Sequence, residues 1–84
     1  MAFNIVILKR EENEENASYH FISTSPTHLE KQHGIFEINK ASGEIKLIRP
    51  AEYDEKNVFF MRASYKIITN WRNEVLPDET VWAS

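Results

Sequence analysis

The chain has 84 residues and a mass of 9.9 kDa, which allows one domain (1–84) with a small core and leaves little room for an enclosed cofactor cavity. Ten basic and 13 acidic residues give a net charge of −3, whereas nucleic-acid binding rests on a basic surface; we expect no nucleic-acid partner. No cysteine is present, so disulfides, thiol catalysis and cysteine-ligated zinc are excluded. The early apolar run Phe3–Leu8 is too short for a secretion signal or a membrane span. We therefore expect a cytoplasmic protein without a membrane partner.

The first third of the chain predicts a β-hairpin with an acidic tip. Asn4–Leu8 is rich in β-branched residues and indicates a strand. The polar run 11–16 favours a turn, and Tyr19–Ile22 indicates the returning strand. The polar segment 23–34, which contains Pro26, is interpreted as a loop or a short helical turn.

A second hairpin is predicted between residues 35 and 48. Phe36 and Ile38 alternate with polar neighbours, and Ile45 and Leu47 alternate in the same way after a turn that contains Gly43. Glycine adopts a positive φ without strain, as such turns require. The pair Arg49-Pro50 predicts the end of the second strand, because proline cannot donate a ladder hydrogen bond.

The segment from 58 to 75 fits two patterns. An alternation over about ten residues predicts a strand, whereas an apolar stripe from Phe60 to Val75 predicts a longer amphipathic helix. Length favours the helix, with Asp54 as its N-cap, Glu55 in its first turn and Pro77 as its stop signal. Trp82 is expected to anchor the tail to the body of the domain. The predicted fold is therefore α+β, with an antiparallel sheet of about four strands and one C-terminal helix across a face; an all-β sandwich is the alternative.

Motifs for catalysis are absent from the sequence. No serine lies in a Gly-x-Ser-x-Gly elbow, and two glycines cannot form a phosphate-binding loop. His28 and His33 have a spacing found in some zinc sites, with Glu30 between them and His20 as a possible third ligand. The surrounding residues resemble a solvated loop that would not orient both imidazoles. We expect no enzyme activity, no metal and no cofactor; a metal-dependent enzyme built on these histidines is the alternative.

The negative charge is gathered in clusters that predict a protein-binding face. Carboxylates pair with arginine, aromatic side chains provide buried contact area, and an acidic face accelerates association with a basic partner. An acidic surface that serves only solubility is the alternative. The predicted contact residues are Glu11, Glu12, Glu14, Glu15, Tyr53, Asp54 and Glu55.

Two family resemblances involve the second hairpin. Residues 34–45, followed by Tyr53-Asp54-Glu55, resemble the hairpin and acidic turn of a cadherin repeat, but the calcium linker of that family is missing. The same hairpin, the segment 59–71 and the end of the chain from Leu76 to Ser84 resemble small bacterial immunity proteins of contact-dependent growth inhibition and related toxin systems. This second resemblance implies a cytoplasmic, non-enzymatic inhibitor that binds a cognate basic toxin domain, often a nuclease, and covers its active site. A generic protein-interaction or regulatory module is the alternative.

Overall fold

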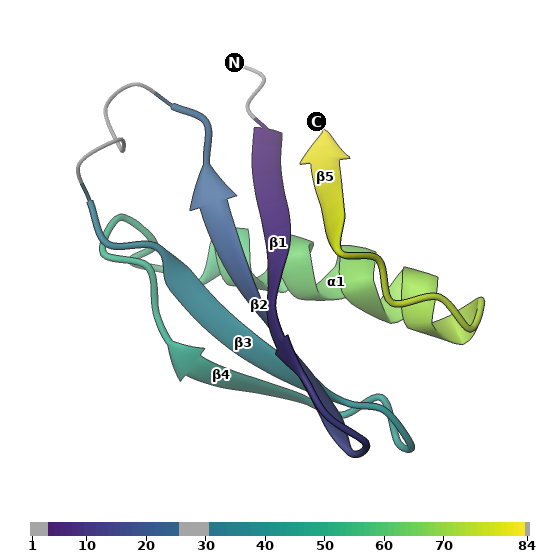
Figure 1. The fold of residues 1–84 in the computed structure, drawn as a ribbon. Coiled ribbons are helices and arrows are strands. Elements are labelled where there is room, and N and C mark those ends of the chain that lie inside the picture. The colour runs from purple at the N-terminus through teal and green to yellow at the C-terminus, as the bar shows by residue number, and fades with distance from the viewer. Residues whose placement is uncertain (1–3, 26–30, 84) are drawn as a thin grey trace.

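A computed structural model describes residues 4–25 and 31–83, and it contains one antiparallel sheet with one helix packed on it (Figure 1). The α+β prediction is confirmed. The order of the strands across the sheet is β4-β3-β2-β1-β5. The elements are β1 (Asn4–Glu12), β2 (Asn16–Ser23), β3 (Gly34–Asn39), β4 (Ile45–Arg49), α1 (Val58–Arg72) and β5 (Glu79–Ala83).

Both predicted hairpins are present. In the first, the strands extend beyond the predicted ranges, so that only residues 13–15 remain at the tip between β1 and β2. In the second, Gly43 has a φ of 76°, as the turn chemistry predicts, and β4 ends at Arg49, directly before Pro50. Part of the predicted loop 23–34 lies outside the described residues.

The contested segment is helical, but α1 begins later and ends earlier than predicted. The residue at the N-cap position is Asn57, with a left-handed φ of 56° and no capping bond from its own side chain. The buried carboxylate of Asp54 instead accepts hydrogen bonds from the backbone N–H groups of Phe59 and Phe60, at 3.1 and 2.9 Å. Asp54 therefore caps the helix from outside it, and Glu55 precedes the first turn. The helix ends at Arg72, five residues before Pro77.

Asp54→Ala is expected to destabilise the domain by about 1–2 kcal/mol, because two N–H groups at the start of α1 lose their acceptor. Asp54→Asn keeps one acceptor oxygen and should cost less. Chemical denaturation followed by circular dichroism measures both losses. The neighbouring exposed Glu55 provides the control, and a loss for Glu55→Ala equal to that for Asp54→Ala would contradict a capping role.

The tail after the helix forms a fifth strand that the sequence interpretation did not include. β5 pairs antiparallel with β1, with Val81 opposite Val6. Trp82 packs against the core from this strand, as expected, and the guanidinium of Arg62 lies 4.8 Å from the centre of its ring. The N-terminal strand β1 therefore lies inside the sheet, between β2 and the C-terminal strand β5.

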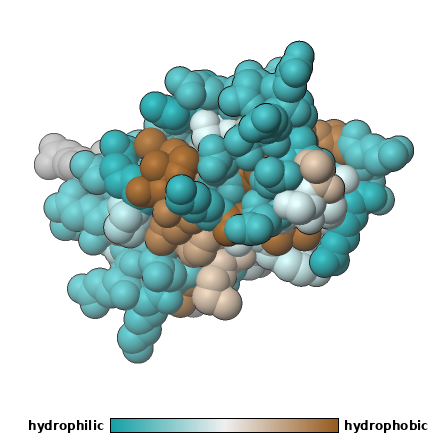
Figure 2. Space-filling view, turned by 90° about the horizontal axis from the view of Figure 1, so that it is seen from below, coloured by the Kyte–Doolittle hydropathy of each residue, from teal (hydrophilic) through white to brown (hydrophobic). Residues whose placement is uncertain are grey.

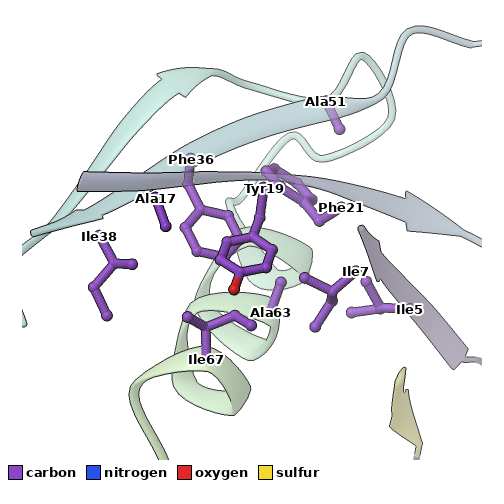
Figure 3. Packing of buried hydrophobic residues seen from close by; sticks show 10 residues of the cluster. All are labelled: Ile5, Ile7, Ala17, Tyr19, Phe21, Phe36, Ile38, Ala51, Ala63 and Ile67. Atoms are coloured by element: carbon purple, nitrogen blue, oxygen red, sulfur yellow. The ribbon is translucent and has the colours of Figure 1, made fainter. Parts of the chain in front are cut away.

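The core lies between the sheet and α1 (Figure 3). Tyr19, Phe21 and Phe36 are fully buried, and the rings of Phe21 and Phe36 both lie about 6 Å from that of Phe60. The hydroxyl of Tyr19 donates to the backbone oxygen of Pro77 at 2.8 Å, which ties the linker before β5 to the sheet. This aromatic centre holds the helix at a fixed position over the strands. The remaining buried apolar side chains of the cluster are Ile5, Ile7, Ala17, Ile38, Ala51, Ala63 and Ile67.

Candidate protein-binding site

The tips of the two hairpins are tied together by Lys40. Its backbone N–H donates to the backbone oxygen of Glu15, and its ammonium group donates to the oxygen of Asn13 and to the carboxylate of Glu12, at 2.9 and 2.7 Å. Lys9 contacts the other carboxylate oxygen of Glu12 and also donates to the backbone oxygen of Leu76. Glu12 is therefore held between two ammonium groups, next to the segment that follows α1.

The two lysines lower the pKa of Glu12 to about 2, chiefly through the hydrogen bond from Lys40 and then that from Lys9. A carboxyl group with a lowered pKa in the folded state stabilises the fold above its unfolded pKa, near 4.5. This contribution disappears as the pH falls towards 2. It amounts to less than about 1 kcal/mol, because the pair is partly exposed to solvent.

Lys40→Met is expected to raise the pKa of Glu12 towards its ordinary value, because the hydrogen bond from Lys40, which lowers this pKa most, is lost. A carbon-13 NMR titration of the Glu12 carboxyl measures this midpoint directly. A midpoint that stays near 2 in Lys40→Met would show that Lys9 alone holds the carboxylate.

The C-terminus of α1 ends in a strained turn. Glu74 has a φ of 62°; its N–H donates to the oxygen of Trp71, and the N–H of Val75 donates to the oxygen of Asn70. These two bonds form a Schellman motif, in which glycine is the usual residue at the left-handed position. A glutamate there costs conformational energy that a glycine would not. Strained backbone of this kind often marks a functional position.

The C-terminal end of α1 and the tips of the two hairpins border a hollow of about 680 Å³, which we call the helix-end hollow. Trp71 forms an aromatic wall, and its indole N–H donates to the oxygen of Lys40 at 2.8 Å. Val75 is 50% exposed. Viewed from the side of the hairpin tips, hydrophobic side chains form an irregular band between hydrophilic ones (Figure 2). The lining residues are Glu12, Lys40, Trp71, Arg72, Glu74, Val75 and Leu76.

The predicted contact residues fall into two groups at opposite ends of the sheet. Glu11, Glu12, Glu14 and Glu15 lie at the β1–β2 tip, and all four are exposed. Glu12 is paired with Lys9 and Lys40, and the other three are called the tip glutamates hereafter. Tyr53 lies at the other end of β2, about 25 Å away for a strand of eight residues. The structure therefore does not bring the predicted residues together in one face.

The second group has mainly structural contacts. The Tyr53 hydroxyl accepts a hydrogen bond from the Ser23 N–H at 2.8 Å, and its ring packs edge-on against Phe59. Asp54 is buried and caps α1. Only Glu55 is exposed, beside a second hollow of about 600 Å³ that Glu52 and Pro50 also line.

Trp71, Glu74 and Val75 were missed as site residues by the sequence analysis. Trp71 and Val75 belong to the apolar stripe, which indicates core positions, and the strain at Glu74 can be recognised only when the end of the helix is known.

The alternative prediction of a metal site involves His28 and Glu30, which lie outside the described residues. Residues 4–25 and 31–83 contain no group of three or more histidine, aspartate or glutamate side chains arranged to hold a metal ion. In the same residues, no helix is both long and apolar enough to span a membrane.

Comparisons of the chain with protein-family models, with curated proteins and with solved structures gave no match.

Proposed function

We propose that this chain is a non-enzymatic immunity protein that binds a cognate basic toxin domain, such as a nuclease, through the tip glutamates and the helix-end hollow. The observation that carries the proposal is the position of exposed carboxylates beside an aromatic and aliphatic hollow. Central apolar and aromatic anchors with a charged rim are the usual arrangement of protein interfaces. Occlusion of a toxin requires only an external surface, which a domain of 84 residues provides.

The negative charge of the carboxylates at the hairpin tip and at the end of α1 favours a basic partner. None of the ion pairs among residues 4–25 and 31–83 includes Glu14, Glu15 or Glu74. These carboxylates are available to lysine and arginine side chains, which in a nuclease hold the substrate phosphates. Glu12 has a different role, because its two lysines already neutralise it and fix the tip against the segment after α1.

The strained Glu74 gives this proposal an independent test. Glu74→Gly is expected to increase stability by about 0.5–1 kcal/mol, because glycine relieves the left-handed backbone, and to weaken partner binding several-fold. Glu74→Ala removes the same carboxylate but keeps the strain, so it should weaken binding without the gain in stability. Thermal unfolding and titration calorimetry measure the two effects. Unchanged affinity in both variants would remove Glu74 from the interface.

The function itself is tested by co-expression with the protein encoded directly upstream, since an immunity gene is expected to follow its toxin gene. We expect the upstream protein to stop growth of the host when expressed alone, and this chain to restore growth and to co-purify with it. Growth arrest that persists with this chain present, without a complex, would contradict the proposed function.

A further inference from the structure

The outer face of α1 carries exposed apolar side chains that no described element covers. The helix packs on one face of the sheet, so its other side is turned away from all five strands (Figure 1). Met61 and Tyr65 are each 63% exposed, and Val58 is 37% exposed. These three residues follow one another at intervals of three and four, which places them side by side along the helix. We call them the outer stripe.

The charges along α1 all have the same sign. Residues 56–72 contain four basic residues and no acidic residue. The guanidinium of Arg62 lies 4.8 Å from the centre of the Trp82 ring, on the side of the helix that faces β5. Lys66 follows Arg62 by one helical turn, and Arg72 is exposed at the C-terminal end of the helix, where it also lines the helix-end hollow.

The carboxylates of the described residues leave this positive charge in place. None of the ion pairs in the described part of the chain includes Lys66 or Arg72. The acidic residues nearest in sequence, Glu55 and Glu74, lie outside the two ends of α1. On β5, Glu79 lies on the strand face opposite to the one that packs on the core. The outer face of α1 therefore combines an apolar stripe with cations alone.

We propose that the outer face of α1 binds an acidic amphipathic helix of a partner protein, with aliphatic side chains on the outer stripe and carboxylates directed at Lys66 and Arg72. Alternating intervals of three and four residues are the spacing at which two helices pack along each other. The 15 residues of α1 provide a contact about 22 Å long. Carboxylates on the partner complement a helix whose charged side chains are all cationic.

An anionic bilayer and a second copy of this chain are poorer occupants of this face. The net charge of −3 and the tip glutamates repel an anionic lipid surface, whereas a single docked helix meets only the cations of α1. Two α1 helices in contact would bring the same cations together. The inference is independent of the proposed function, which assigns a basic partner to another surface, with Arg72 at the border between the two.

The test begins with a selection of displayed random peptides on the intact protein. Peptides of about 18 residues are long enough to form a helix that matches α1. We expect enriched peptides that combine aliphatic residues at helical spacing with aspartate or glutamate. Fluorescence anisotropy then measures the affinity of the best binder. Met61→Asp should weaken this binding at least tenfold, whereas the matched variant Ile48→Asp, at a residue of β4 that is 49% exposed, should have less than a twofold effect.

A second pair of variants tests the charge. Lys66→Glu should weaken binding of the selected peptide at least fivefold, and added salt should weaken binding to the wild type. Lys46→Glu makes the same change of net charge at an exposed position of β4 and should have less than a twofold effect. Chemical-shift mapping by NMR with the same peptide should place the largest changes on residues 58–69.

The proposal is overturned by the absence of an enriched peptide, by enrichment of basic or uncharged peptides, or by equal effects within either pair of variants. Binding of the wild type to phosphatidylglycerol vesicles, or its dimerisation in sedimentation, would also overturn it where Met61→Asp abolishes the effect. The tip variant Glu14→Lys/Glu15→Lys should bind the selected peptide no more weakly than the wild type, and Met61→Asp should bind the upstream-encoded protein normally. This result and the toxin experiment can therefore fail separately.

Discussion

Replacing Gly34 with alanine is expected to destabilise the domain by about 3 kcal/mol, at the upper end of the usual cost of overpacking a core. Gly34 stands opposite Phe21 in the β2–β3 register. A Cβ atom at this position would come within 1.9 Å of the end of the Phe21 ring. The ring cannot move aside easily, because it is fully buried and packs between Phe36 and Phe60. Urea denaturation measures the loss.

A double-mutant cycle separates this clash from other effects of alanine. Phe21→Leu shortens the side chain that alanine would meet, so Gly34→Ala should cost much less in that background than in the wild type. Equal costs in both backgrounds, or a cost below about 0.5 kcal/mol in the wild type, would contradict the packing described for this position.

Trp71→Ala is expected to cost about 3 kcal/mol, because Trp71 connects the helix end to the β3–β4 turn. Its indole N–H donates to the oxygen of Lys40, and its ring lies so close to Gly43 that a Cβ there would approach to 2.6 Å. Trp71→Phe keeps most of the buried ring and loses the hydrogen bond, so it should cost about 1–2 kcal/mol.

Tyr65 on the same helix is the control for Trp71. Its side chain is 63% exposed, and Tyr65→Ala should change stability by less than about 0.5 kcal/mol. Thermal and chemical denaturation compare the three variants. A loss for Tyr65→Ala as large as that for Trp71→Ala would contradict a special role of the contact with the hairpin turn, because alanine has the higher helix propensity at both positions and cannot itself account for a loss.

The sequence predicted local structure well where a pattern continued over many residues. The second hairpin followed from alternation and from the turn chemistry of Gly43, and the helix followed from the length of its apolar stripe. β5 was missed because five residues near the end of the chain do not distinguish a paired strand from a tail anchored by Trp82. The cap of α1 was assigned to the correct side chain but to the wrong position, because Asp54 reaches the helix across the intervening residues.

The site was less predictable because its parts come from separate elements. Charge clusters at Glu11–Glu15 and Asp54–Glu55 are visible in the sequence, but only the strand register shows that they lie at opposite ends of β2. The hollow depends on where α1 ends, on the left-handed Glu74 and on the contact between Lys40 and Glu12. No periodicity in the sequence reports contacts of this kind.

The most direct test of the proposed interface is the affinity of the upstream-encoded protein for two variants of equal net charge. Glu14→Lys/Glu15→Lys reverses the charge at the hairpin tip, whereas Glu55→Lys/Glu79→Lys makes the same change at exposed positions elsewhere. We expect the tip variant to bind at least tenfold more weakly, mainly through slower and more salt-dependent association, and the control variant to bind within about threefold of the wild type. Equal affinities for the two variants would contradict the assignment of the interface to the hairpin tip and the helix-end hollow.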